Sequence, residues 1–176
     1  EAGLNQYLLA RNIFEDFLAK KRISSSTFEI EKTAKFFAAA DLLNAEHATI
    51  WHNMRFYFNP ITSRLIPIGF DASRITRPSK MSKRSISVDR NPMGIFDDNY
   101  FISEYVKHLE RFSKENYLKE FFQKHYDDFA EDLSKINRSY PYVRLLPEEL
   151  KINQKYIKYR LDPPSPLSVR LNINNE

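Results

Sequence analysis

Apolar residues recur at helical spacing along the first quarter of the chain. Between residues 4 and 20 they fall three to four positions apart, as on one face of an amphipathic helix. The residues of this face are Leu4, Leu8, Ile13, Phe14, Phe17 and Leu18. A run of serines follows, and Ser26–Glu29 has the capping-box pattern that opens a helix. We therefore predict a second helix from this point to about Asn44.

Three more helices are predicted in the second half of the chain. Asp97 or Asp98 precedes a face of regularly spaced apolar residues and is a suitable N-terminal cap. A longer helix is predicted from about residue 116 to residue 138. Pro147 is followed by two glutamates, which is typical of the first turn of a helix. This last helix is expected to end at Asp162, before a run of prolines.

Between the second and third predicted helices the spacing changes to that of a β-hairpin. The strands are Met54–Phe58 and Arg64–Ile68. Asn59–Thr62 supplies the turn, since proline fixes one backbone angle and asparagine can close a turn with its own side chain. The fold class that follows is α+β, mostly helical, with one β-hairpin between helices.

Two polar residues flank this hairpin. Asn53 enters the first strand and Asp71 leaves the second, so an amide and a carboxylate are expected near each other. Hard oxygen ligands of this kind suit Mg²⁺ bound to a nucleotide phosphate. The alternative is that Asn53 caps a turn and Asp71 lies in a solvated loop.

The stretch after Asp71 is strongly basic and has no regular pattern. Residues 72–94 are predicted to form a long loop, a feature that is often functional in a domain of this size. Arg74 and Arg77 are candidates for docking phosphate groups, because guanidinium binds them in bidentate fashion. Binding of an acidic peptide and a plain solvated loop are the other two interpretations.

Composition narrows the function classes. The chain has 176 residues, of which 42% are hydrophobic, enough for one domain with a substantial core. The absence of cysteine excludes disulfides, thiolate metal sites and cysteine nucleophiles. No apolar stretch approaches the ~20 residues of a membrane span. The net charge of +4 is too mild for the dense basic face of a nucleic-acid-binding domain, and it favours phosphate-bearing ligands or acidic protein partners.

A family resemblance rests on the same segment. FEIEKTAKFFAAADLLNAEHATIWHN, which begins at Phe28, leads into the hairpin and Asp71, and DDNYFISEYVKHLERFSKENYLKEFF continues the match more weakly. This order of helix, loop, Asn, hairpin and Asp resembles the core of the CotH spore-coat kinase family of bacteria. That family has a reduced protein-kinase fold.

The resemblance implies a division of the chain and a function. Residues 1–162 would be the C-lobe-like portion of a CotH-type kinase domain whose N-lobe is absent from this sequence. Residues 163–176 would be a proline-rich linker and a strand that leads to a following segment. Asn53 and Asp71 would hold Mg²⁺ on ATP, for phosphoryl transfer to a Ser/Thr-containing surface protein. The expected location is the cell surface, the spore coat or the secreted fraction.

The chain departs from the kinase pattern at one position. Kinases place a catalytic aspartate five residues before the metal-binding Asn, and here that position is Ala48. The adjacent His47 or Glu46 is the candidate to accept the proton of the acceptor hydroxyl, His47 with the help of a carboxylate such as Glu46 or Asp41. The expectation leans to an atypical protein kinase, with a non-catalytic pseudokinase-like scaffold or cell-surface interaction module as the alternative. A helical domain whose basic loop binds polyanions ranks third.

Overall fold

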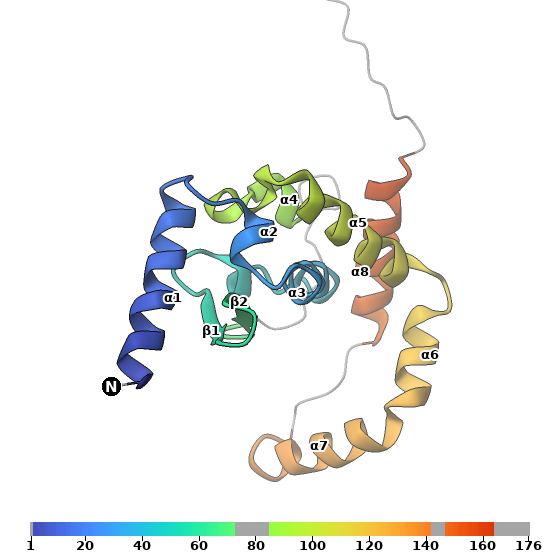
Figure 1. The fold of residues 1–176 in the computed structure, drawn as a ribbon. Helices are drawn as coiled ribbons and strands as arrows, with labels where there is room; N and C mark the ends of the chain where they lie inside the picture. Colours follow the sequence, from blue (N-terminus) through green and yellow to red (C-terminus); the bar gives the residue numbers. More distant parts are fainter. Residues whose placement is uncertain (1, 73–84, 142–146, 164–176) are drawn as a thin grey trace, which may run out of the picture.

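Helices dominate the described part of the chain, where one antiparallel hairpin interrupts them (Figure 1). The computed structural model describes residues 2–72, 85–141 and 147–163. In chain order the elements are α1 (Ala2–Leu18), α2 (Ser24–Thr27), α3 (Ile30–Leu43), the 3-10 helix η1 (Glu46–Thr49), β1 (Arg55–Asn59), β2 (Arg64–Ile68), α4 (Ser87–Arg90), the 3-10 segment η3 (Pro92–Asp97), α5 (Asn99–Ser113), α6 (Tyr117–Lys124), α7 (Tyr126–Ser139) and α8 (Pro147–Leu161). The prediction of an α+β, mostly helical fold with one hairpin is confirmed.

Helix α3 forms the centre of the structure and packs against both α5 and α8. Two buried amides of α8 bind carbonyl groups at the ends of its neighbours. Asn153 Nδ2 donates to Leu42 O of α3 at 2.9 Å, and Gln154 Nε2 donates to Phe112 O of α5 at 2.8 Å. Buried side-chain amides need such partners, because an unpaired buried donor costs about 1–3 kcal/mol. The three helices are therefore held in one alignment by hydrogen bonds as well as by apolar packing.

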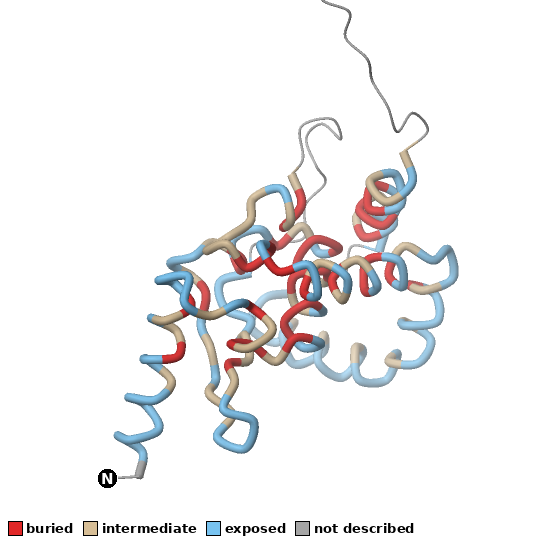
Figure 2. The backbone as a smooth tube through the Cα atoms, turned by 45° about the horizontal axis from the view of Figure 1, so that its top comes forward, coloured by how far each residue is buried: buried red, intermediate tan, exposed pale blue. Residues whose placement is uncertain are grey.

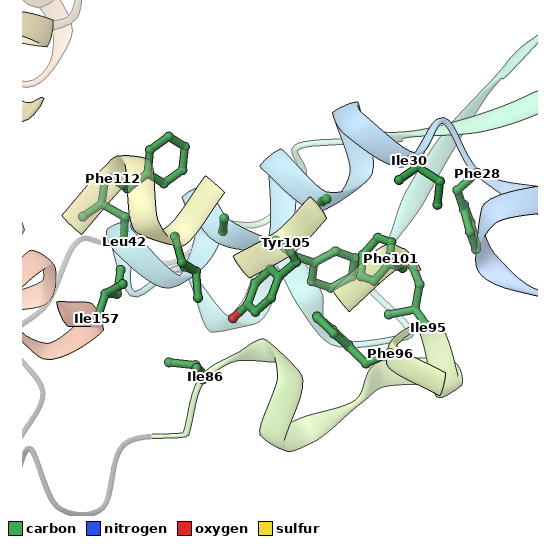
Figure 3. Close-up of a cluster of buried hydrophobic side chains, with 14 of the residues drawn as sticks. Phe28, Ile30, Leu42, Ile86, Ile95, Phe96, Phe101, Tyr105, Phe112 and Ile157 are labelled. Carbon is green, nitrogen blue, oxygen red and sulfur yellow. The ribbon is translucent and has the colours of Figure 1, made fainter. Parts of the chain in front are cut away.

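Aromatic rings fill the space between α3, α5 and η3 (Figure 3). Phe37 is fully buried and meets Phe96 and Phe101 edge-on, at centroid distances of 5.5 and 6.0 Å. Phe96 in turn meets Tyr105 edge-on at 4.9 Å. Edge-to-face pairs of this kind are the favoured geometry for aromatic rings and add to the stabilisation from buried area. The many phenylalanines of the sequence thus build the core.

The hairpin packs its inner face on this core. Arg55 pairs with Ile68 and Asn59 with Arg64 across the two strands. Phe28, fully buried between α2 and α3, lies 5.3 Å from the ring of Phe56 on β1 and 4.9 Å from Phe17 on α1. Because an isolated two-stranded hairpin is only marginally stable in water, these ring contacts hold it in place.

Several predicted boundaries are confirmed. Strand β2 and the start of α8 at Pro147 lie where the pattern placed them. Helix α3 ends at Leu43, and Asn44 caps it with a φ of 53°, the left-handed conformation common at helix ends. Asp98 caps α5 by accepting a hydrogen bond from Tyr100 N at 2.9 Å. Asn59 Oδ1 accepts from Ile61 N at 3.0 Å, which is the predicted side-chain closure of the hairpin turn.

The predicted capping box at Ser26–Glu29 is wrong. The hydroxyls of Ser26 and Thr27 bond backward to Ile23 O, at 3.0 and 2.9 Å, and close the short helix α2. Phe28 then forms a bridge to Leu65 of β2, and α3 begins only at Ile30. The hydrogen-bonding residues thus serve the end of one helix rather than the start of the next.

Two other predictions are corrected. Residues 72–94 are not one loop, because α4 and the start of η3 lie within them. The long helix expected over residues 116–138 is two helices, since the backbone at His125 leaves the helical conformation with φ −113° and ψ 21°. No residue of α7 is buried, and Figure 2 shows that part of the tube as mostly exposed. Because α7 buries no face against the core, packing does not require it to continue along the axis of α6.

The strand and linker expected at 163–176 fall outside the described residues except for residue 163. Among the described residues, no helix combines the length and the apolar content needed to cross a membrane.

Replacement of Phe28 by Ala is expected to destabilise the protein by about 3–5 kcal/mol, because a fully buried ring that joins α1 to the hairpin is lost. Urea unfolding followed by circular dichroism measures this change. Tyr126→Ala on α7, where the ring is 70% exposed, is the control and should change stability by less than about 0.5 kcal/mol. Similar midpoints for the two variants would contradict the docking role of Phe28.

Candidate functional site

The amide and the carboxylate that flank the hairpin meet at its base. Asn53 Nδ2 donates a hydrogen bond to Asp71 Oδ2 at 2.9 Å. The same amide group donates to His47 O of η1 at 3.1 Å. The register explains this meeting, because pairing of Arg55 with Ile68 places the residues just outside the strands on the same end of the hairpin.

His47 joins this pair through its ring. Its Nδ1 lies 4.0 Å from Asp71 Oδ2, the oxygen that also accepts from Asn53. The side chains of His47 and Asp71 are 59% and 55% exposed, so the cluster faces solvent. The structure therefore brings together His47, Asn53 and Asp71, which the sequence separates by up to 24 positions.

The backbone at Asp71 is unusual. Its φ of 50° lies in the left-handed region, which few residues other than glycine adopt and in which aspartate is among the better tolerated. The preceding ring of Phe70 lies under the guanidinium of Arg55, at 5.0 Å from its centroid. A cation–π contact of this length stabilises the chain as it leaves β2. The contacts of Phe70 and of Asn53 thus fix where the Asp71 carboxylate lies.

Glu46 lies apart from this cluster. Its Oε1 is 3.8 Å from Arg90 Nε of α4, and its carbonyl accepts from Thr49 Oγ1 at 2.8 Å. Ala48, which the resemblance aligns with the catalytic aspartate of kinases, is 3% exposed. Of the two proposed proton acceptors, the structure places His47 at the Asn53–Asp71 pair and Glu46 beside Arg90. Arg74 and Arg77, predicted to dock phosphate, lie outside the described residues.

Arg90 of α4 connects η1 to α3 through its guanidinium. This role was not predicted from the sequence. Arg90 Nη2 donates to Thr49 Oγ1 at 3.1 Å and lies 3.8 Å from Asp41 Oδ1. Its Nη1 donates to Ser85 O at 2.9 Å. Arg90 was one of many cations in an apparently irregular stretch, and nothing local in the sequence set it apart.

Asp41 is a buried carboxylate at the junction of three helices. It accepts hydrogen bonds from Tyr105 OH at 2.6 Å, from Ser87 Oγ at 2.9 Å and from Ser87 N at 3.0 Å. Burial raises the pKa of Asp41 to about 6, against the opposing effect of these hydrogen bonds and of Arg90. The pKa of the Tyr105 hydroxyl is raised as well, first by burial and then by the charge of Asp41.

The sequence contained a signal for this buried acid. Asp41 follows Phe37 by four residues and Ala34 by seven, so it falls on the apolar face of α3. A carboxylate on such a face needs buried donors, and Ser87 and Tyr105 supply them. Its partners place Asp41 in the helical core, whereas His47 lies at the exposed cluster. The expectation that Asp41 assists His47 is therefore replaced by a structural role in holding α4 on α3 and α5.

A second ion pair holds α4 from the other side. Arg160 on α8 binds the carboxylate of Asp89 with its two terminal nitrogens. Nη2 donates to Oδ1 at 2.7 Å, and Nη1 donates to Oδ2 at 2.8 Å. This bidentate contact lowers the pKa of Asp89. Helix α4 has only four residues, which is too few to be stable alone, so these contacts with α3, α5 and α8 position it.

The donor set at the hairpin base fits a cation that brings ligands of its own. Asp71 and the amide oxygen of Asn53 are hard donors, and Asn53 needs only to turn its amide for that oxygen to face the ion. In the described part of the chain no group of three or more His, Cys, Asp or Glu side chains could hold a metal by itself. Mg²⁺ is commonly held by one or two protein oxygens and completes its shell with phosphate and water. Two protein oxygens are therefore a donor set compatible with Mg²⁺ that brings phosphate ligands of its own.

Comparison with protein families, with curated proteins and with solved structures finds no match to this chain.

The raised pKa of Asp41 predicts a pH dependence of stability. Between its ordinary value of 3.8 and the folded value of about 6, the folded protein holds a proton that the unfolded chain has released. The contribution of Asp41 to the free energy of unfolding should therefore increase by about 1 kcal/mol as the pH falls from 7 to 5. Urea unfolding of the native protein and of Asp41→Asn at both pH values isolates this effect, because Asn does not titrate. A native protein that loses stability relative to Asp41→Asn on acidification would contradict the prediction.

Proposed function

We propose that this chain is the metal-holding portion of an atypical, CotH-like protein kinase, which transfers a phosphoryl group from Mg-ATP to a Ser/Thr-containing surface protein. The observation that carries the proposal is the 2.9 Å contact between Asn53 and Asp71 across the base of the hairpin. In the family that the sequence resembles, the equivalent Asn and Asp hold the metal on ATP.

Each residue of the cluster has a part in this proposal. Asp71 and Asn53 offer oxygens to Mg²⁺, which neutralises phosphate charge when bound. His47, whose Nδ1 lies 4.0 Å from Asp71 Oδ2, accepts the proton of the acceptor hydroxyl. Arg74 and Arg77 help to place the acceptor or the transferred group. Phosphoryl transfer depends mainly on positioning and charge, so a small set of residues is sufficient for the chemistry of this lobe.

The surface around the cluster supports a partner that completes the site. Trp51 is 70% exposed, and on the outward face of the hairpin Tyr57 and Ile68 are 55% and 48% exposed. Large apolar side chains exposed together often mark an interface. In a kinase-like arrangement an N-lobe with its phosphate-binding loop would cover this side of the hairpin and enclose the nucleotide.

A non-catalytic scaffold is the second candidate, and one observation favours it. Ala48 is buried where kinases have their catalytic aspartate, and Glu46 is engaged by Arg90. If His47 does not serve as a base, the same site binds nucleotide or a surface-protein partner without turnover. The two functions differ in whether phosphate reaches an acceptor.

The metal site predicts coupled responses of two residues. On addition of Mg²⁺ and ATP together, the backbone amide NMR signals of Asn53 and Asp71 should shift with one common affinity. ATP alone should shift them less, because neither the uncharged amide of Asn53 nor the anionic carboxylate of Asp71 attracts phosphate. Asp71→Ala should weaken the response at Asn53 at least about tenfold, the cost of one charged ligand.

Asp132→Ala on α7 is the matched control, since this carboxylate is 72% exposed and lies outside the cluster. It should leave the Mg-ATP response unchanged. Independent affinities at Asn53 and Asp71, or a response that survives Asp71→Ala, would contradict the shared cation.

The choice between kinase and scaffold requires a transfer measurement. The full-length protein is incubated with Mg-ATP, and transfer of labelled phosphate to a serine-rich acceptor is followed. The kinase proposal predicts transfer that is lost in Asp71→Ala and reduced at least about 100-fold in His47→Ala, as expected for removal of a general base. Nucleotide binding without transfer to any acceptor would establish the scaffold instead.

A further inference from the structure

A second site candidate lies away from the hairpin, where α5 turns into α6. A cavity of about 670 Å³ opens here, within the range of pockets that hold small ligands. Four cations line it, namely Lys35 of α3, Arg111 and Lys114 at the end of α5, and Lys124 of α6. Two carboxylates, Glu115 and Glu120, also line it, so cations are in excess.

The four cations differ in what they contact, because the Arg111 guanidinium lies over the ring of Tyr117, 6.0 Å from its centroid, on the wall of the same cavity. None of the four forms an ion pair within 4 Å with another residue in the described part of the chain, whereas Lys135 on nearby α7 is 2.7 Å from Glu131. Like charges gathered around one cavity raise its potential and attract anions. The cavity is therefore suited to an anionic ligand, and phosphate is the anion that both Arg and Lys bind well.

One wall of the same cavity is aromatic. The rings of Tyr117 and Phe121 lie nearly parallel, at an interplanar angle of 22° and a centroid distance of 6.1 Å. The ring of His125 continues the row, 4.9 Å from Phe121. Aromatic faces beside cations are the combination that holds a planar base and its phosphate, since stacking of a base on such a ring stabilises binding by about 1–3 kcal/mol.

Buried residues of α5 and α8 hold the turn and the ring that form part of this wall. Gln154 of α8 is buried and donates to Phe112 O at 2.8 Å and to Lys114 O at 2.9 Å, which fixes the turn that carries Lys114. Phe112 in the core lies 5.0 Å from Tyr117 and supports its ring. A site built on such fixed groups loses little conformational entropy when a ligand binds.

The surroundings limit the length of the ligand. Next to the cavity, the surface between α3 and α5 has three carboxylates, those of Glu31 on α3 and of Glu104 and Glu110 on α5. Lys107 on the same surface is paired with Glu104 at 3.3 Å. A nucleic-acid strand would have to pass these acids, which repel its phosphates. A ligand with one phosphate and one planar ring fits the cavity without reaching them.

We propose that the cavity between α5 and α6 binds a nucleoside monophosphate, with the phosphate on Arg111, Lys114 and Lys124 and the base on Tyr117 and Phe121. This site is independent of the Asn53–Asp71 cluster and requires no divalent cation.

The test is titration of the whole chain with AMP in EDTA at low salt, followed by NMR or calorimetry. AMP should bind with a Kd below about 1 mM, ribose 5-phosphate at least about fivefold more weakly, and adenosine more weakly still. Lys114→Ala and Lys124→Ala should each weaken AMP about fivefold to tenfold, and Phe121→Ala about tenfold.

Lys135→Ala is the matched control, because this lysine lies outside the cavity, and it should leave AMP binding unchanged. Asp71→Ala should leave it unchanged as well, which separates this site from the proposed Mg-ATP site. The proposal is overturned if AMP does not saturate, if it binds no better than ribose 5-phosphate, or if the cavity variants bind as the native protein does.

Discussion

The buried carboxylate of Asp41 is the constraint around which the helices are arranged. An ionised carboxylate inside a protein is costly unless several donors surround it, and here donors come from Ser87 and Tyr105, while Arg90 lies 3.8 Å away. Because these residues belong to α4 and α5, satisfying one side chain of α3 fixes two other elements. Helix α4 is too short to persist alone, and the Asp89–Arg160 contact completes its attachment by joining it to α8.

This arrangement extends to the candidate site through η1. Arg90 binds Thr49 Oγ1 and lies close to Glu46, so the segment that carries His47 rests on the same network that holds α4. The other half of the site comes from the hairpin, whose inner face is docked by Phe28. Two independent supports therefore converge on the contact between Asn53 and Asp71. Neither support depends on the exposed cluster, so variants of its side chains should leave the fold intact.

The sequence predicted those parts of the fold in which local chemistry and packing agree. Asp98 is both a good cap and correctly placed before an apolar face, and α5 begins there. The meeting of Asn53 with Asp71 was predictable because hairpin register is a local property.

The break between α6 and α7 at His125 could not be predicted from the sequence. The apolar spacing continues through His125, and the helix ends there because α7 has no core to pack against. Helix α4 was missed because its stability comes from Asp41, Tyr105 and Arg160, which are distant in the sequence. Ser26 and Thr27 were misassigned because hydroxyls serve the end of one helix and the start of another equally well.

The contacts of Arg90 with Asp41 and Glu46 also limit which residue could act as a proton acceptor beside the hairpin. Ala48 lies in the interior of η1, and a carboxylate there would need buried donors of its own, while Arg90 is already shared between Asp41 and Glu46. A catalytic aspartate at that position would therefore be hard to accommodate in this chain. His47 lies instead on the solvent-facing side, where its side chain is 59% exposed and Nδ1 stands 4.0 Å from the Asp71 oxygen. A proton acceptor at that position needs no buried donors, so in the proposed transfer the base comes from the exposed side of η1 rather than from its interior.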